Sequence, residues 1–355
     1  MKRKIAIIAG GDSSEYGVSL RSAAGIYSFL ADNGNRMSEN EYELTIVCLR
    51  GNDWKALAET DSVLAQNNGV VPEESEMWVA IDKNDFSYTY NGEKHAFDFA
   101  YITIHGTPGE NGVLQGYLDM IGLPYSCCGV LAAAMTFNKY TCNHYLKGFG
   151  VRVAESVLLR KSDIGYQASE IVEKVGLPCF IKTNVGGSSF GVTKVKTAEE
   201  VQPAIDKAFA EGDEVICEAF MKGVEITCGV YKTKDKAVAF PITEVVTSNE
   251  FFDYDAKYNG QVDEITPARI PDEVRDKVQA LTLKIYDILG CKGIIRVDYI
   301  LTGDEAKGER LEINLLEVNT TPGMTATSFI PQQVRAAGLN IGEVLSEIVE
   351  DNFTV

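Results

Sequence analysis

Residues 182–195 read KTNVGGSSFGVTKV, a loop of small residues between two stretches that are typical of β-strands. Such a loop offers many backbone N–H groups with little steric bulk, which is what wrapping a phosphate group requires. It is not a P-loop, because Val192 and Thr193 follow Gly191 where that motif has Lys and then Ser or Thr. The dinucleotide-binding fingerprint fails too, since two of the glycines are adjacent. The local sequence leaves two interpretations open, a phosphate-binding loop and a plain β-hairpin turn.

Upstream of this loop, the apolar pattern predicts a compact α/β unit over about the first 130 residues. We expect strands at 4–9, 44–49 and 99–104, a helix at 113–121, and polar surface excursions at 52–76 and 91–95. Because open α/β sheets bind ligands at the carboxyl ends of their strands, the functional loops of this unit are expected there.

From residue 137 the pattern changes to a small α+β unit, and a third unit follows Gly223. In the third unit we expect strands at 225–232, 236–246, 293–301 and 311–319, and helices at 272–289 and near 341–350. Between them, about 20 residues after residue 246 show no clear period. Loops of that length inside a compact domain are usually lids or binding loops.

Composition limits the class of protein and of partner. The chain has 355 residues, with 33 Lys and Arg against 51 Asp and Glu, and its net charge of −18 argues against a nucleic acid or an anionic membrane as partner. No stretch approaches the roughly 18 uncharged apolar residues of a membrane span, and the apolar run from residue 4 is too short for a secretion signal. The eight cysteines show no C-x-x-C spacing, which favours reduced thiols in a cytoplasmic protein.

Two late strands carry a pattern that suits a metal ion. Arg296 and Asp298 are two residues apart, as are Glu317 and Asn319, so each pair points to one face of its strand. Two carboxylates and an amide are oxygen ligands of the kind that Mg²⁺ takes together with substrate phosphates. The alternative is a solvated sheet face. The apolar neighbours of both pairs favour a largely buried strand pair, where unpaired charge would be costly.

Two lysines and two glutamates stand near the opening loop and the following unit. Lys139 lies on a helix, and Lys182 ends a strand immediately before the loop; either is a phosphate ligand or an ordinary surface lysine. Glu218 and Glu225 flank the junction between the small unit and the last one. Such junctions are natural hinges and ligand sites.

Six segments in chain order carry a resemblance to a known family. They are GGDSSEYGVSL (10–20), IHGTPGENGVLQG (104–116), IKTNVGGSSFG (181–191), FFDYDAKY (251–258), RVDYIL (296–301) and LLEVNTTPGMTATS (315–328). Together they closely resemble the D-alanine–D-alanine ligases of the ATP-grasp superfamily. The resemblance implies an ATP-grasp fold with a Rossmann-like α/β domain (1–136), a central α+β subdomain with the glycine and serine flap (137–222), and a C-terminal α+β subdomain with the metal site and a lid loop at about 247–266 (223–355).

The resemblance also implies the reaction, which is the ligation of two D-alanines to D-alanyl-D-alanine for peptidoglycan synthesis, with release of ADP and phosphate. In this family the carboxylate of the first D-alanine attacks the γ-phosphate of ATP, and the amine of the second displaces phosphate from the acyl phosphate. The expected cofactor is Mg²⁺, as two ions, with Mn²⁺ as a substitute. The expected partners are ATP, D-alanine and a second copy of the chain, in a homodimer.

By position, the resemblance assigns roles to individual residues. The nucleotide-binding residues are Lys139, Lys182, Ser189, Glu218, Glu225 and Lys257, and the magnesium ligands are Asp298, Glu317 and Asn319. The residues around the reacting groups are Glu15, Ser188, Tyr258, Arg296 and Gly323, and the other substrate contacts are His105, Ser328 and Phe329. In this assignment Glu15 receives the ammonium group of the first D-alanine. Arg296 and the Gly323 N–H stabilise the oxyanion.

The chain departs from the family pattern at Thr183, at Asn111 and at Tyr16-Gly17, which replace a proline, an acidic residue and a charged pair. Tyr258 predicts D-alanine as the second substrate, because related ligases that accept D-lactate typically have phenylalanine there. Two other functions stay open. One is an ATP-grasp ligase acting on D-serine, D-lactate or another amino acid, and the other is a nucleotide-binding regulatory protein without catalysis.

Overall fold

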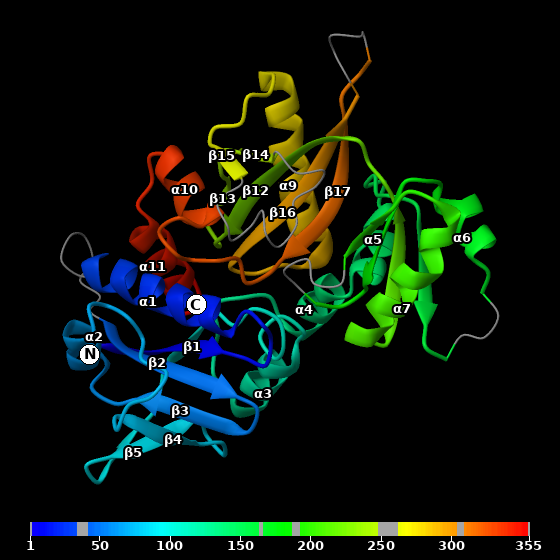
Figure 1. Ribbon diagram of the computed structural model, residues 1–355. Helices are drawn as coiled ribbons and strands as arrows, with labels where there is room; N and C mark the ends of the chain where they lie inside the picture. The colour runs from blue at the N-terminus through cyan, green and yellow to red at the C-terminus, as the bar shows by residue number, and fades with distance from the viewer. Residues whose placement is uncertain are drawn as a thin grey trace.

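The computed structural model describes residues 2–33, 42–162, 166–186, 192–247, 262–303 and 309–353. These residues form three β-sheets, which occupy separate regions of the molecule and are coloured blue to cyan, green, and olive green to orange in Figure 1. The mixed α/β and α+β class expected from the sequence is confirmed. No helix in these ranges is both long and apolar enough to cross a membrane.

The first sheet has seven strands in the order β6-β5-β4-β3-β2-β1-β7. Their bounds are β1 (Arg3–Gly10), β2 (Tyr42–Arg50), β3 (Asp53–Leu57), β4 (Trp78–Asp82), β5 (Ser87–Tyr90), β6 (Glu93–His95) and β7 (Phe99–Ile102). β1 runs parallel to both β2 and β7, and the other neighbours are antiparallel. The loops that follow β1 and β7 therefore leave the same edge of the sheet and lie side by side there.

The ranges 52–76 and 91–95, expected to be surface excursions, are largely exposed or half-exposed, but both contain regular structure that was not expected. The first range holds β3 and the helix α2 (Thr60–Gln66), and the second holds β6, so the sheet is wider than expected. Gly51 and Asn52 form a two-residue connection between β2 and β3, in which Arg50 pairs with Asp53. A glycine in such a connection is a hairpin signal, but the strand that follows it, β3, has only five residues, and two of them are charged.

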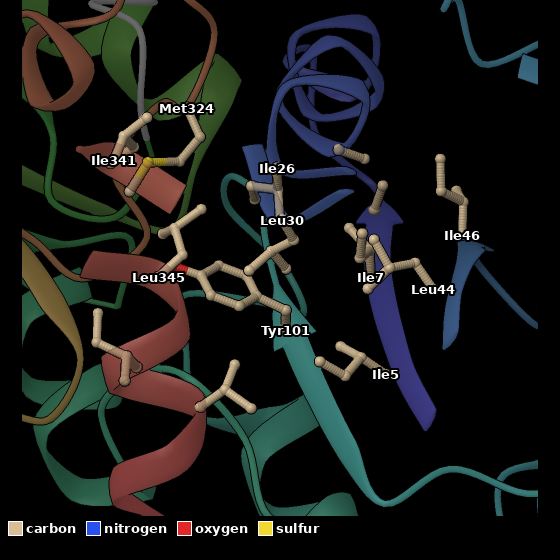
Figure 2. Packing of buried hydrophobic residues seen from close by; sticks show 14 of the residues in the cluster. Ile5, Ile7, Ile26, Leu30, Leu44, Ile46, Tyr101, Met324, Ile341 and Leu345 are labelled. Carbon is tan, nitrogen blue, oxygen red and sulfur yellow. The ribbon is translucent and has the colours of Figure 1, made fainter. Parts of the chain in front are cut away.

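Helices from both ends of the chain cover one face of this sheet. α1 (Tyr16–Asn33) packs beside the C-terminal α11 (Ile341–Asp351), with α10 (Phe329–Ala336) next to them (Figure 1). Figure 2 shows Met324, Ile341 and Leu345 pointing toward Ile26, Leu30 and Tyr101. The last 30 or so described residues thus complete the core of the first sheet. The domain bounds 1–136, 137–222 and 223–355 stay a prediction, and this core crosses the division between the first and the third.

The second sheet has four strands in the order β10-β9-β11-β8. The segment before this sheet forms α3 (Val113–Ile121), which packs in the core of the first sheet, and α4 (Val130–Phe137) and α5 (Lys139–Lys147), which share the core of the third sheet. The elements of the second sheet's own region are β8 (Ser156–Arg160), α6 (Ala168–Val175), β9 (Cys179–Thr183), β10 (Thr193–Val195), the short 3₁₀ helix η1 (Ala198–Glu200), α7 (Val201–Glu211) and β11 (Glu214–Ala219). α6 and α7 pack against the sheet. β9 and β10 pair antiparallel, so the segments that flank the opening loop form a hairpin.

The third sheet has the order β15-β14-β12-β16-β17, with β13 paired to β12. The bounds are β12 (Gly223–Lys232), β13 (Ala237–Ala239), β14 (Thr243–Thr247), β15 (Val262–Ile265), α9 (Asp272–Leu289), β16 (Ile294–Thr302) and β17 (Glu312–Asn319). α9 packs on β12 and β13 and shares a hydrophobic core with them. The expected helices at 113–121 and 272–289 are confirmed with the same bounds, whereas α4 and α10 were not expected.

Candidate active site

β16 and β17 bring four of the predicted residues face to face. In the register of this antiparallel pair, Arg296 lies opposite Asn319 and Asp298 lies opposite Glu317. The buried Asp298 carboxylate accepts from Arg296 Nε and Nη2, both at 2.8 Å, from Asn319 Nδ2 at 3.1 Å, and from Thr227 Oγ1 at 2.5 Å. This is a hydrogen-bonded polar cluster within a sheet whose other strand positions are largely apolar.

Charge pairing dominates the state of Arg296. Burial by itself would lower the pKa of the guanidinium, but the Asp298 carboxylate more than offsets this, with Glu317 and Glu225 adding to it, so the pKa lies above its ordinary value. The guanidinium also lies over the Phe329 ring, 5.3 Å from its centroid. Arg296 is therefore a fixed positive charge between the strand pair and the start of α10.

The donor set fits a magnesium ion. Asp298 and Glu317 supply carboxylate oxygens, and Asn319 keeps its side-chain oxygen because only its Nδ2 donates to Asp298. Hard oxygen donors in this number, with substrate phosphates completing the shell, are what Mg²⁺ takes. Across the described ranges, no three His, Cys, Asp or Glu side chains form a metal-binding group, and this set contains two carboxylates and one amide.

Two lysines and a glutamate form a second cluster, next to the opening loop. Lys182 Nζ lies 2.5 Å from Glu218 Oε2, with 13% and 7% of the two side chains exposed. Lys139, the first residue of α5, donates through Nζ to the Gly186 carbonyl at 2.6 Å. Asn138 caps α5, its Oδ1 accepting from the Thr141 N–H at 2.9 Å, and the Lys139 N–H donates to the Asn184 carbonyl at 3.2 Å, which holds Lys139 beside the loop.

The two lysines differ in their electrostatics. Burial lowers the pKa of Lys139, and the positive charge of Lys182 lowers it further, while Glu317 and Glu218 oppose both effects. For Lys182 burial also acts to lower the pKa, but Glu218 overcomes it, so the pKa of Lys182 is raised. The helix α5, which begins with Lys139, packs against β17, which carries Glu317, and the charge of Glu317 acts on the pKa of both lysines, so the lysine cluster and the β16–β17 cluster adjoin each other.

Glu225 connects these clusters. It lies on β12, where it pairs with Ile300 of β16 and Val245 of β14, only a short connection away from the end of β11. Its charge contributes to the raised pKa of both Lys182 and Arg296. The junction between the second and third sheets therefore holds Glu218 on one side and Glu225 on the other.

A third cluster lies at the edge of the first sheet, where β1 and β7 end. Ser13 Oγ donates to the His105 carbonyl at 2.7 Å and accepts from the Glu15 N–H at 3.2 Å. This serine therefore joins the two loops and holds Glu15, which immediately precedes α1, next to His105. The His105 side chain is buried, with Nε2 3.5 Å from Ser22 Oγ.

Sequence reasoning gave no role to Glu110, which belongs to the same cluster. Burial raises the pKa of its carboxyl group, and the nearby Glu15 adds to this, while His105 and the Gly106 N–H oppose it. The Gly106 N–H donates to Glu110 Oε2 at 2.7 Å. The signal was the spacing of this acid, five residues after His105 in the segment IHGTPGENG.

The C-terminal loop meets this cluster from the other side. Thr321 Oγ1 donates to the Ile104 carbonyl at 3.0 Å, directly before His105. Ser328 Oγ accepts from the Thr325 N–H at 3.1 Å and lies 2.7 Å from Thr325 Oγ1. A Cβ at Gly323 would lie 2.9 Å from Ser328 Oγ, so a larger residue at 323 would displace that hydroxyl.

The structure therefore brings together thirteen of the predicted residues in three adjoining clusters. They are Glu15, His105, Lys139, Lys182, Glu218, Glu225, Arg296, Asp298, Glu317, Asn319, Gly323, Ser328 and Phe329. Ser188, Ser189, Lys257 and Tyr258 lie outside the described residues, as does most of the lid loop expected at about 247–266.

Family models match most of the chain. The model described as "D-ala D-ala ligase N-terminus" matches residues 4–128, and the one described as "D-ala D-ala ligase C-terminus" matches residues 145–350. Among similar curated proteins, a D-alanine–D-alanine ligase of Phocaeicola vulgatus is 62% identical over 355 residues, covering 99% of this chain and 100% of the relative. A second, from Bacteroides fragilis, is 63% identical over 353 residues, with 99% and 100% covered.

Solved structures of related ligases superpose on nearly the whole chain. The VanG D-Ala:D-Ser ligase from Enterococcus faecalis superposes with a TM-score of 0.82 at 30% identity, covering 99% of both chains. The D-alanyl-alanine synthetase A from Vibrio cholerae superposes with a TM-score of 0.81 at 26% identity, covering 99% of this chain and 98% of the other. The two family models, the similar curated proteins and the solved structures agree over most of the chain, and the chain belongs to the D-alanine–D-alanine ligase family, with its ATP-grasp fold.

Proposed function

We propose that this chain ligates two D-alanine molecules to D-alanyl-D-alanine at the expense of ATP, as a step of peptidoglycan precursor synthesis. The observation that carries the proposal is the pairing of Arg296, Asp298, Glu317 and Asn319 across β16 and β17, next to Lys139 and Lys182, in a chain of this family. Phosphoryl transfer depends mainly on positioning and charge neutralisation, which these side chains supply.

ATP is proposed to lie between the second and third sheets. Lys139 and Lys182 bind its phosphates, and Glu218 and Glu225 contact the adenine and ribose. Ser189 and Lys257, outside the described residues, are proposed to complete the phosphate contacts. Burial is the main cause of the lowered pKa of Lys139, and a phosphate bound beside its ammonium group would favour the charged form.

Two Mg²⁺ ions, for which Mn²⁺ can substitute, are proposed to be held by Asp298, Glu317 and Asn319. When bound, the metal supplies positive charge that neutralises the phosphate oxygens. The chain itself fixes the ligands, because Arg296, Asn319 and Thr227 together orient the Asp298 carboxylate.

The substrate contacts are proposed to come from the first and third clusters. Glu15, with Ser188 and Tyr258 linked to it, receives the ammonium group of the first D-alanine. The carboxylate of that D-alanine attacks the γ-phosphate of ATP, and ADP leaves. His105, Ser328 and Phe329 contact the second D-alanine. Its amine attacks the carbonyl carbon of the acyl phosphate and displaces phosphate. Arg296 and the Gly323 N–H then stabilise the oxyanion that forms at that carbon.

One solved relative is named as a D-Ala:D-Ser ligase, which keeps D-serine as a second candidate acceptor. Relatives at about twice that identity are named as D-alanine–D-alanine ligases, and they favour D-alanine. We further propose a homodimer in the cytoplasm, where ATP is available.

The test is incubation with ATP, Mg²⁺ and D-alanine, and identification of the product by mass. Parallel reactions contain D-alanine with D-serine or with D-lactate. We expect D-alanyl-D-alanine as the main product at neutral pH. Faster formation of the mixed dipeptide or of the depsipeptide would overturn the proposed acceptor, and absence of phosphate release in every reaction would overturn the proposed catalysis.

A further inference from the structure

Tyr16 opens the first turn of α1, directly after Glu15 and at one of the places where the chain departs from the family pattern. Its hydroxyl lies 3.1 Å from Cys48 Sγ, near the end of β2. The guanidinium of Arg50 lies over the Tyr16 ring, 5.1 Å from the centroid. Tyr16 is half-buried against the core that contains Cys48, so β2 holds this side chain at both the ring and the hydroxyl.

The first three residues of the loop before α1 are attached to its neighbours on both sides. The Gly11 N–H donates to the Leu49 carbonyl at 2.7 Å, and Asp12 Oδ1 accepts from the Gly51 N–H at 2.6 Å. Toward the other side, Ser13 joins the loop to His105. These contacts hold residues 11 to 13, while Tyr16 is the attachment on the helix side of Glu15.

Both partners of the Tyr16–Cys48 contact are uncharged at neutral pH. Burial raises the pKa of the Tyr16 hydroxyl, and the contact with Cys48 raises it further, although Arg50 opposes this. Burial likewise raises the pKa of the Cys48 thiol. The contact is therefore a neutral hydrogen bond, and its effect will not vary across the neutral pH range.

We propose that Tyr16 is a positioning residue for the first D-alanine. Held by Cys48 and Arg50, it fixes the start of α1 and with it the direction of the Glu15 carboxylate. This inference rests on the proposed function, since it takes Glu15 as the group that receives the ammonium of the first D-alanine.

The experiment compares Tyr16→Phe with Tyr27→Phe. Tyr27 lies on the same helix and also uses its hydroxyl in a hydrogen bond, to Asp61 Oδ1 at 2.6 Å, but its partner is in α2. Initial rates over a wide range of D-alanine concentration give separate KM values for the two D-alanines. We expect Tyr16→Phe to raise the KM of the first D-alanine about three- to tenfold, the equivalent of one neutral hydrogen bond, and to change kcat less than about twofold.

Both variants are expected to lower the melting temperature by similar amounts, since each loses one hydrogen bond of a tyrosine hydroxyl. Tyr27→Phe is expected to leave both KM values unchanged. Equal melting temperatures for the two variants together with an unchanged KM in Tyr16→Phe would show that Tyr16 is only structural, and would overturn the inference. Dipeptide formation by the unchanged protein tests the proposed function separately, because the inference concerns only the ratio of variant to unchanged protein.

A second set of variants keeps the test decisive if Tyr16→Phe folds poorly. Cys48→Ala removes the partner and is expected to raise the same KM, whereas Cys48→Ser retains a hydrogen-bonding group and is expected to preserve most of the affinity. In the double variant with Tyr16→Phe and Cys48→Ala, the shift should not exceed that of either single variant, because both remove one contact. Additive shifts would contradict the proposed contact.

Discussion

Nζ of Lys182 lies 2.5 Å from Oε2 of Glu218, and the two side chains reach each other diagonally across β9 and β11. In the register of these strands, Lys182 pairs with Ile216 and Glu218 pairs with Phe180, so the ion pair joins residues two positions out of register. Both side chains are almost fully buried. Removal of one partner would therefore leave the other as an uncompensated buried charge.

Glu218→Gln is expected to weaken ATP binding and to destabilise the fold by about 3 kcal/mol, because it leaves the Lys182 ammonium without its carboxylate. Isothermal calorimetry with a non-hydrolysable ATP analogue measures the first effect, and denaturant unfolding measures the second. Asp287→Asn is the matched control. It breaks the ion pair with Lys232, in which 64% of the aspartate side chain is exposed, and should cost less than about 1 kcal/mol. Equal costs for the two variants would contradict the importance of the buried pair.

Arg296→Ala is expected to leave ATP binding largely intact while lowering dipeptide formation by about 100-fold or more, the usual cost of removing an oxyanion-stabilising donor. Arg296→Lys keeps the charge but loses the two parallel bonds to Asp298, so it should give an intermediate rate. Steady-state kinetics and nucleotide titration separate the two effects. Unchanged turnover in Arg296→Ala would rule out the assigned role.

The strand pair of the site was accessible from the sequence because alternation in a strand is a local property. The i, i+2 spacing of Arg296 with Asp298, and of Glu317 with Asn319, predicts from the sequence alone that each pair lies on one face of its strand. The register that sets Asp298 opposite Glu317 was not accessible, because it depends on how two strands and the segment between them meet. The same limit applies to Lys182 and Glu218, which 35 intervening residues separate in the sequence.

Burial of single polar residues was the least predictable feature. Glu110 looks like a loop residue in the sequence, yet packing of the Thr321 segment and the His105 loop shields its half-buried carboxyl group enough to raise its pKa. In the same way, no local pattern shows that Met324 and Leu345 complete the core beneath Ile26. Long-range contacts of this kind are properties of the whole fold rather than of any window of sequence.

Glu110 makes the stability of the protein depend on pH. Because burial raises its pKa above the ordinary value of 4.5, the folded state binds the proton more tightly than the unfolded state does. The contribution of this group to stability is therefore greatest below 4.5 and is lost as the pH rises through the raised pKa. In Glu110→Gln this dependence disappears.

We expect the free energy of unfolding of the original protein, relative to that of Glu110→Gln, to fall between about pH 4 and the raised pKa and then to become constant. Urea unfolding at close pH intervals measures this difference. A difference that stays constant over the whole range would mean that the Glu110 carboxyl group has the same proton affinity in the folded and unfolded chains.

Glu317→Gln tests the metal site while leaving in place the hydrogen bonds that the Asp298 carboxylate accepts. Glu317 lies opposite Asp298 in the strand register. Asp298 was not chosen for replacement, because it accepts the hydrogen bonds from Arg296, Asn319 and Thr227 and its loss would disturb the whole cluster. Loss of one carboxylate weakens the attraction for a divalent cation, and we expect the Mg²⁺ concentration for half-maximal activity to rise about tenfold or more. Excess Mg²⁺ should then restore part of the rate.

Glu312→Gln provides the matched control, since Glu312 lies on the same strand β17 but pairs with Thr302 and contacts the exposed Arg152. Its Mg²⁺ dependence should equal that of the original protein. Direct titration with Mn²⁺, followed by electron paramagnetic resonance, gives a binding measurement that does not depend on turnover. If Glu317→Gln and Glu312→Gln bind Mn²⁺ equally well, the metal is not held by the β16–β17 pair, and the ligand assignment of Asp298, Glu317 and Asn319 is wrong.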